Sequence, residues 1–333
     1  MLLHIRDLKV TLPDQGERLH AVRGIDIDVD EGETLCLVGE SGCGKSITAL
    51  SIMRLLPRGA KLASSELRFG DTDLSALSES RLSALRGRQM SMIFQEPMTA
   101  LNPVFTIGDQ LRAVYRRHTG AGKREAQDRA IAVLESVGLT NAALRLRQYP
   151  HQLSGGLRQR VLIAMALMCE PRMLICDEPT TALDVTTQAQ ILRILKQAQE
   201  ERRMGMIFIT HDLGVVARIA DRVAVMYAGR IVEHGARQAV LRNPAHPYTK
   251  GLIASVPKPQ GAQPGTARLA SIPGNVPAFH SEDARCPFLS RCPRRMDVCA
   301  VEPPPLKVAP SGQHVACHLQ FEAKEAAIHD TAS

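Results

Sequence analysis

Alternation and continuity of hydrophobic residues predict a mixed α/β chain. Apolar residues alternate with carboxylates in residues 25–30 (IDIDVD), which indicates a strand with one buried face, and residues 1–30 are expected to form antiparallel strands. Residues 35–38, 173–176 and 206–209 are continuously apolar, as in strands that are covered on both faces. Segments of helical composition separate these runs. We therefore predict a parallel sheet of the α/β class, preceded by a smaller antiparallel β subdomain.

Two stretches interrupt this pattern and suggest a division of the chain. Residues 96–160 are expected to hold an inserted helical subdomain, because their central part is rich in Arg, Ala, Glu and Leu. Residues 256–277 carry repeated Pro and Gly, which is typical of a linker. We therefore expect a first domain over residues 1–255 and a small C-terminal extension over residues 256–333, with a frayed tail.

A glycine-rich loop follows the first continuous run. Residues 39–46 read GESGCGKS and precede a helix-forming run, which is the strand, loop and helix context of a phosphate-binding loop. Backbone N–H groups would bind phosphate oxygens, Lys45 would reach the β- and γ-phosphates, and Ser46 would bind Mg²⁺. The alternative is a tight glycine turn before a core helix. The candidate nucleotide ligands are Gly39, Ser41, Gly42, Cys43, Gly44, Lys45, Ser46 and Ile47.

Two carboxylates follow the second continuous run. Asp177 and Glu178 come at the carboxyl end of a predicted strand, the edge where ligands of open α/β sheets bind. Asp177 is expected to hold Mg²⁺, and Glu178 to act as general base on the attacking water. His211, which follows the next strand, is a candidate contact of the γ-phosphate. The alternatives are two helix-capping acids and a structural histidine.

Composition limits these interpretations. The chain has 333 residues, of which 44% are hydrophobic, and this suffices for a sizeable core. Its net charge of +7 is spread along the sequence, which favours a solvated basic surface over a nucleic-acid site. No apolar run approaches the roughly 20 residues that cross a bilayer. Because the N-terminus also lacks a secretory pattern, a cytoplasmic location is expected.

Further motifs resemble those of the ATP-binding cassette (ABC) ATPases. Residues 153–160 (LSGGLRQR) resemble the family signature, Gln95 its Q-loop, residues 181–184 (TALD) its D-loop and His211 its switch histidine. The resemblance implies a P-loop NTPase core with an inserted helical subdomain, and ATP and Mg²⁺ as cofactors. It also implies that Gln95 contributes to catalysis and to the Mg²⁺ site.

The signature suggests a second phosphate site. Ser154, Gly155 and Gly156 are expected to open a helix and so to offer N–H groups and a hydroxyl to an anion. Taken without the family, this tetrapeptide fits a capped core helix equally well. The head-to-tail dimer that the resemblance implies would place these residues, with Asp184, at the nucleotide of the other subunit.

Three more stretches resemble the ATPase subunits of oligopeptide, dipeptide and nickel importers. They are residues 94–103 (FQEPMTALNP), 243–249 (NPAHPYT) and 272–274 (IPG). This resemblance implies a subunit that powers peptide import from the cytoplasmic face of the cell membrane. The implied partners are a second ABC ATPase, identical or related, two membrane-spanning permease subunits and, indirectly, an extracytoplasmic solute-binding protein, with no nucleic acid.

Two competing functions remain to be compared with this one. A soluble ABC ATPase acting on nucleic acid or ribosomes usually carries two cassettes or a long coiled-coil insertion, and the sequence has neither. A regulatory nucleotide-binding protein without turnover would not need Glu178 and His211.

Four of the eight cysteines group near the C-terminus. Cys286, Cys292, Cys299 and Cys317 have the spacing C-x5-C-x6-C-x17-C, in a segment with too little apolar content to fold on a core of its own. Four thiolates suit tetrahedral zinc or an iron–sulfur cluster, and reduced cysteines in a poorly ordered tail are the alternative. The resemblance to peptide importers implies a [4Fe–4S] cluster.

Two further positions of the nucleotide site are the residue that would stack on adenine and Cys43 in the phosphate loop. Many ABC ATPases stack adenine on an aromatic residue ahead of the phosphate loop, but residues 14–20 contain no Tyr, Phe or Trp, and His20 is a weak substitute. Cys43 lies beside Lys45 and a helix N-terminus, which favours a reactive thiolate that ATP would protect. The alternative is a small residue that merely fits the loop.

Overall fold

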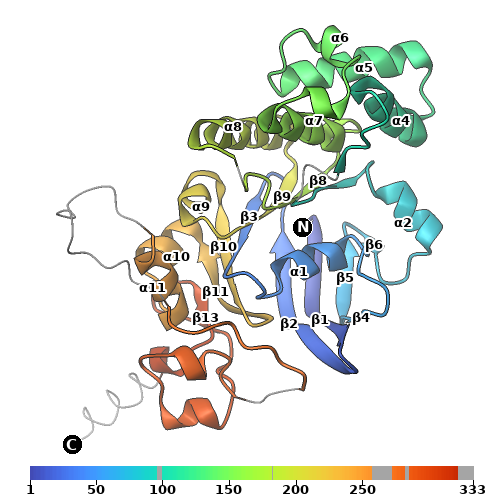
Figure 1. Cartoon of the computed structure of the whole chain (residues 1–333). Helices are drawn as coiled ribbons and strands as arrows, with labels where there is room; N and C mark the ends of the chain where they lie inside the picture. The colour runs from blue at the N-terminus through green and yellow to red at the C-terminus, as the bar shows by residue number, and fades with distance from the viewer. Residues whose placement is uncertain (96–99, 182, 257–271, 282–284, 322–333) are drawn as a thin grey trace, which may run out of the picture.

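The computed structural model describes most of the chain, and its elements form two sheets with helices around them (Figure 1). The described residues are 1–95, 100–181, 183–256, 272–281 and 285–321. The expectations for the frayed tail and for most of the linker therefore lie outside the described residues.

The N-terminal sheet is antiparallel, as predicted. Its order is β2-β1-β5-β6, and β4 also pairs with β1. In β2 the side chains of Ile25, Ile27 and Val29 are buried while Asp26 is exposed, so the predicted alternation holds. The strands are β1 (Leu3–Asp14), β2 (Glu17–Val29), β4 (Lys61–Ala63), β5 (Glu66–Phe69) and β6 (Thr72–Asp73).

The second sheet contains the continuously apolar runs. Its order is β12-β13-β11-β10-β3-β9-β8-β7, and the five strands from β10 to β7 run parallel. Every residue of β3, β8 and β9 is buried, as predicted for strands covered on both faces. The strands are β3 (Thr34–Val38), β7 (Met90–Ile93), β8 (Met173–Asp177), β9 (Gly205–Thr210), β10 (Arg222–Tyr227), β11 (Arg230–Ala236), β12 (Lys307–Val308) and β13 (His314–Val315).

Helices surround the parallel strands, and α4 to α7 gather at one end of the molecule (Figure 1). This group matches the helices expected between the two halves of the parallel sheet. Thr106 caps α4 by accepting a hydrogen bond from the Asp109 amide. The helices are α1 (Lys45–Ile52), α2 (Glu79–Leu85), α4 (Ile107–Thr119), α5 (Lys123–Ser136), α6 (Ala142–Arg145), α7 (Gly155–Leu167), α8 (Val185–Arg202), α9 (Leu213–Ile219), α10 (Arg237–Arg242) and α11 (Pro247–Ala254).

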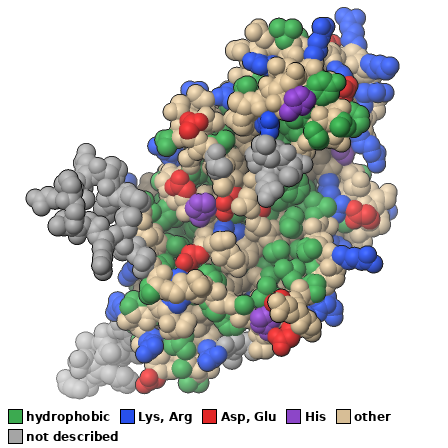
Figure 2. All heavy atoms as spheres, in the orientation of Figure 1, with side chains coloured by type: hydrophobic (Ala, Val, Ile, Leu, Met, Phe, Trp, Pro, Cys, Tyr) green, Lys and Arg blue, Asp and Glu red, His purple; other side chains and the backbone are tan. Residues whose placement is uncertain are grey.

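The parallel strands separate two hydrophobic cores. On β3, Cys36 and Val38 pack into a core with α4, α5 and α7 to α9, while Leu35 and Leu37 pack into a core with α1 and the antiparallel sheet. Opposite faces of one strand therefore join the helical half of the molecule to the antiparallel half. None of the helices in the described part of the chain is long and apolar enough to span a bilayer. Figure 2 shows Lys and Arg side chains scattered around the visible face rather than gathered in one patch.

The C-terminal unit, residues 272–281 and 285–321, packs directly on this framework. Its strands β12 and β13 extend the parallel sheet beyond β11. Phe288 is buried, and its ring contacts the rings of Tyr227, Tyr248 and His246. Short helical turns complete the unit: η2 (Leu289–Arg291), η3 (Asp297–Ala300) and η4 (His318–Gln320). The low apolar content of this segment is therefore offset by packing on the larger core.

Replacing Phe288 by Ala is expected to lower the free energy of unfolding of the C-terminal unit by about 3–5 kcal/mol, because the deletion leaves a cavity among three rings. Native-state hydrogen exchange should show faster exchange in peptides from residues 285–300. Val301→Ala, at an exposed position of the same unit, is the matched control. Identical exchange in the wild type and in Phe288→Ala would show that this ring does not anchor the unit.

Candidate nucleotide site

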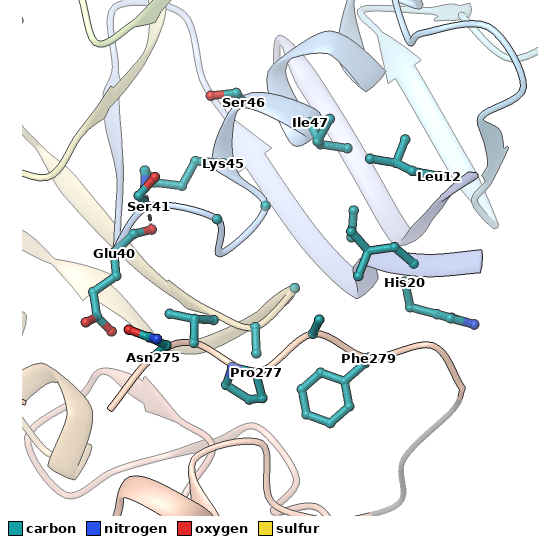
Figure 3. Close-up of a pocket in the computed structure, with 18 of the residues that line it drawn as sticks. Leu12, His20, Glu40, Ser41, Lys45, Ser46, Ile47, Asn275, Pro277 and Phe279 are labelled. Carbon is teal, nitrogen blue, oxygen red and sulfur yellow. Dashed lines mark hydrogen bonds between the residues drawn. The ribbon is translucent and has the colours of Figure 1, made fainter. Parts of the chain in front are cut away.

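A cleft of about 1040 Å³ lies where the phosphate loop, both sheets and the C-terminal unit meet. Its lining includes most of the predicted ligands of residues 39–47, together with Gln95, Glu178 and His211. Figure 3 shows the loop and the start of α1 on one side of this cleft and residues of the C-terminal unit on the other. The structure thus brings together, from four separate parts of the chain, side chains that the sequence singled out.

The phosphate loop packs closely against the backbones of β2 and β10. Gly44 has φ of 108°, and a Cβ there would lie 2.4 Å from the carbonyl oxygen of Ala21. A Cβ on Gly39 would lie 2.2 Å from the carbonyl oxygen of Met226. The Gly229 amide donates to the carbonyl oxygen of Cys43 at 2.9 Å. Glycine is therefore required at two loop positions by close approach as well as by conformation.

Lys45 lies within the loop. Its side chain is nearly buried, and the ammonium donates to the carbonyl oxygens of Gly39 at 2.8 Å and Glu40 at 2.9 Å. These contacts fix the position of the positive charge beside the loop amides. The arrangement is suited to anions, because the charge and the helix N-terminus act on the same small volume.

Ser46 and Asp177 form an oxygen pair at the foot of the cleft. The Ser46 hydroxyl donates to Oδ1 of Asp177 at 3.0 Å. Burial raises the pKa of Asp177, while the Ser46 hydrogen bond and the Lys45 charge act in the opposite direction. A hydroxyl and a buried carboxylate are ligands that Mg²⁺ accepts, and a cation there would stabilise the ionised carboxylate. Gln95, just after β7, lines the same cleft with an exposed side chain.

Glu178 and His211 face each other at the ends of adjacent strands. Oε2 of Glu178 lies 3.2 Å from Nδ1 of His211 and accepts a hydrogen bond from the Thr181 hydroxyl at 2.9 Å. Glu178 has φ of 46°, and its amide donates to the Ile209 carbonyl oxygen at 3.0 Å. A left-handed conformation is rare for Glu and is typical of functional sites that their surroundings hold in place.

The signature residues do not line this cleft. Ser154 is the N-cap of α7, and both Ser154 and Gly155 are exposed. A Cβ on Gly156 would lie 2.8 Å from Cγ2 of Thr187, whose amide and hydroxyl donate to Asp184 at 2.9 and 2.7 Å. Asp184 thus caps α8 and sits with the signature on a surface apart from the cleft. The predicted helix start is present, although the Ser154 side chain makes no capping hydrogen bond.

The expectation of a reactive thiolate at Cys43 is wrong. Cys43 is fully buried in the core that contains α1 and the antiparallel sheet. Burial raises the pKa of its thiol and outweighs the attraction of Lys45. The small-residue alternative therefore describes this position.

Glu40 connects the loop to the C-terminal unit, which the sequence did not predict. Its amide donates to the Tyr248 hydroxyl at 2.9 Å, and its carboxylate accepts from both terminal nitrogens of Arg291 at 2.7 and 3.0 Å. Arg291 is only 4% exposed. Tyr248 belongs to the NPAHPYT stretch, but nothing in that pattern indicates a contact with a loop two hundred residues earlier.

Beyond the phosphate loop, the cleft is bordered by several side chains that the sequence did not single out. Its lining includes Leu12, Leu19 and His20 from the β1–β2 hairpin, Ile47 from α1, and residues 275–279. In Figure 3 the ring of His20 is directed away from the phosphate loop. Apolar side chains, rather than His20 alone, therefore border this side.

The four C-terminal cysteines line one small cavity, with Phe288 and Leu289 among its other walls. All four are free thiols, and burial raises the pKa of Cys286 and of Cys317 to about 11. Among the described residues, however, no three His, Cys, Asp or Glu side chains are placed to hold a metal ion. The grouping that the spacing predicted is present, but the arrangement by itself supports neither zinc nor an iron–sulfur cluster.

Comparison with known proteins identifies the family. Residues 22–181 match the ABC transporter family, and residues 232–299 match the oligopeptide/dipeptide transporter C-terminal region. The dipeptide transport ATP-binding protein DppD of Bacillus subtilis is 48% identical over 98% of this chain and 97% of its own length. The oligopeptide transport ATP-binding protein OppD of Salmonella typhimurium is 45% identical over 97% of this chain and 95% of its own.

Solved structures agree with these relatives. The dimeric ATP-binding cassette MJ0796, in a post-hydrolysis state bound to ADP and Pi, superposes with a TM-score of 0.64 at 26% identity, over 71% of this chain and 99% of that one. CbiO1 from Clostridium perfringens, part of the transporter complex cbiONQ, gives 0.62 at 25% identity, over 73% and 91%. The expected fold and resemblance are confirmed: the chain belongs to the ABC transporter ATPases, in the branch that carries the oligopeptide/dipeptide transporter C-terminal region.

Proposed function

We propose that this chain binds and hydrolyses ATP in the cleft and so powers the import of peptides. The observation that carries the proposal is the convergence of the Ser46–Asp177 pair and the Glu178–His211 pair on the phosphate loop. The chain is similar to dipeptide and oligopeptide transport proteins over nearly its whole length, which supports peptides as the solute class. The alternative of a nucleic-acid or ribosomal partner has no support among these relatives.

The phosphate end of the cleft provides the binding groups for ATP. The amides of residues 39–47 and the Lys45 ammonium would hold the β- and γ-phosphates, since both act at the N-terminus of α1. Ser46, Asp177 and Gln95 would hold Mg²⁺, either directly or through water. When bound, the ion neutralises charge that develops on the phosphate oxygens.

Glu178 would act as the general base. It would accept a proton from the water that attacks the γ-phosphate, and the Thr181 hydroxyl and His211 hold its Oε2 in position. His211 is largely exposed at the mouth of the cleft, where its ring can contact the γ-phosphate. Both residues directly follow buried parallel strands, which hold the backbone at these positions before the nucleotide binds.

The signature supports a composite site between two subunits. Ser154, Gly155 and Gly156 begin α7 on an exposed surface, and Asp184 lies beside them at the start of α8. Because they do not line the cleft of their own chain, they would meet the nucleotide bound to a second ATPase. That second subunit is a copy of this chain or a related ATPase.

The transporter complex supplies the remaining partners. Two permease subunits form the membrane path, a solute-binding protein delivers the peptide, and this chain is a peripheral subunit on the cytoplasmic side of the membrane. The exposed side chains of Phe94, Val104 and Phe105 lie close in sequence to Gln95 and to the start of α4. This apolar group, next to a nucleotide ligand, would contact the permeases and transmit closure of the dimer.

We also propose that the chain consists of two domains with different roles. Residues 1–255 would form the nucleotide-binding domain, with the helical subdomain over about 96–160, and residues 256–333 the extension with the cysteine site. Four thiols that face one cavity and form no disulfide fit the donor set of a [4Fe–4S] cluster. Cys286, Cys292, Cys299 and Cys317 would hold it, and the cluster would have a structural or regulatory role.

Glu178→Gln is expected to bind Mg-ATP but to lower kcat by about 10²–10⁴-fold, because the amide cannot accept the proton of the attacking water. The variant should accumulate as an ATP-bound dimer, detected by gel filtration after incubation with labelled ATP. Glu201→Gln, on the outer part of α8, is the matched control and should hydrolyse ATP normally. Normal turnover by Glu178→Gln in the assembled transporter would remove this residue from the role of general base.

Mixing two defective chains tests the composite site. If the second subunit is a copy of this chain, Lys45→Ala and Ser154→Arg should each retain no ATP alone, whereas a one-to-one mixture should retain about a quarter of the wild-type amount, because half of its dimers carry one intact site. Retention would be measured as labelled ATP that elutes with the dimer. A Ser154→Arg chain that retains ATP fully by itself would show that each site is complete within one subunit.

Protein purified without oxygen is expected to be brown and to contain iron and acid-labile sulfide, both of which should be lost in Cys292→Ser. Cys169→Ser, which changes a cysteine outside the C-terminal group, should leave the colour unchanged. Colourless anaerobic protein with stoichiometric zinc would replace the cluster by zinc, and protein without metal would leave four reduced thiols.

A further inference from the structure

We propose that residues 275–279, which belong to the C-terminal unit, form the wall against which the base and ribose of the nucleotide lie. The inference rests on the proposed function, because it concerns the same ATP. It assigns to the extension a direct part in nucleotide binding, in addition to any role of its cysteines.

The segment lies along the cleft that contains the phosphate loop. Residues 275–279 line the same cleft as Lys45 and Ser46. Figure 3 shows Asn275, Pro277 and Phe279 following one another along the side of the cleft that faces Ile47 and Leu12, with the phosphate loop at one end. A nucleotide whose phosphates occupy the loop would therefore extend its base into the space between these two sides.

Apolar side chains border this space on both sides. Leu12, Leu19 and Ile47 provide apolar surface on one side, and Val276, Pro277 and Ala278 provide it on the other. A purine between two apolar surfaces removes both faces of its ring from water, which favours binding in proportion to the area covered. This slot supplies the base contact for which residues 14–20 offer no aromatic side chain.

Arg291 links the residues just before the wall to the phosphate loop. Arg291 donates from Nε to the Pro273 carbonyl oxygen at 2.8 Å and from Nη2 to the Ile272 carbonyl oxygen at 3.2 Å. The same guanidinium holds the Glu40 carboxylate of the loop. One buried cation therefore sets the distance between the phosphate site and the start of the wall.

The second end is fastened to the β1–β2 hairpin. The His20 amide donates to the Phe279 carbonyl oxygen at 2.8 Å, and the Arg23 guanidinium lies 3.8 Å from the centre of the Phe279 ring. Next to it, Nε2 of His280 is 2.8 Å from Oδ2 of Asp14. A surface held at both ends loses little conformational freedom when a ligand binds, so its apolar contacts contribute to affinity.

The test compares two ligands that both carry three linked phosphates, only one of which also has a base and a ribose. Mg-tripolyphosphate occupies only the phosphate loop, whereas Mg-ATP would also contact the wall. For the double variant Val276→Ser/Pro277→Gly, we expect Kd for Mg-ATP to rise about 5- to 10-fold and Kd for Mg-tripolyphosphate to stay within about 2-fold of the wild type. Phe279→Ala, which removes the contact between the Phe279 ring and Arg23 of the β1–β2 hairpin, should also raise Kd for Mg-ATP more than Kd for Mg-tripolyphosphate. Val308→Ala, exposed in the same unit, is the control.

Each other result overturns the proposal. Unchanged ATP affinity in both variants would mean that the segment covers the cleft without contacting the base, and tighter ATP binding would mean that it occludes the cleft. Equal loss of both ligands would mean that the variants disturb the phosphate loop instead. A wild-type chain that binds tripolyphosphate and ATP equally would also exclude a base contact, whereas one that binds neither would refute the proposed function itself.

Photolabelling locates the base independently of any variant. With 8-azido-ATP on the wild-type chain, we expect the label on the peptide that contains residues 275–279, with excess ATP preventing it. Labelling confined to peptides that line neither side of this slot would place the base away from the wall.

Discussion

Close packing of backbone around the phosphate loop is the constraint on which the other parts of the site depend. β2 approaches the loop at Gly44 and β10 approaches it at Gly39, and a hydrogen bond from Gly229 closes the remaining side. The first of these strands belongs to the antiparallel sheet and the second to the parallel sheet. The loop is therefore the point at which the two sheets fix each other, and its geometry is set by the whole framework rather than by its own sequence.

The parallel arrangement of β8 and β9 explains why Glu178 and His211 lie together in the cleft. β8 and β9 are neighbours in register, so residues that follow them in the chain emerge side by side at one edge. Glu178 and His211 come from positions more than thirty residues apart, yet Oε2 of Glu178 lies 3.2 Å from Nδ1 of His211. Glu178 also has a left-handed backbone conformation, with φ of 46°, which is uncommon for a residue other than Gly.

Most of this site could be predicted from the sequence because its signals are short and local. A strand, a glycine loop and a helix lie within twenty residues, and the carboxylates follow directly on a buried strand. The burial of Cys43 could not be predicted in this way, because Lys45 beside it in sequence suggested a charged site, whereas the side chain also packs into an apolar core formed by distant segments. The roles of Tyr248 and Arg291 were missed for a related reason: both depend on contacts between positions separated by two hundred residues or more.

The bidentate contact between Glu40 and Arg291 has a consequence for how this protein can change. Composition marks a boundary near residue 256, yet the packing continues across it, because Arg291 contacts the loop and Phe288 covers Tyr227 and Tyr248. Removing the extension would leave an acidic side chain without its cation at the nucleotide loop and would expose aromatic surface. For this chain, the cassette and the extension therefore form one cooperative unit, and a foreign extension would have to present a cation at the place of Arg291 to pair with Glu40.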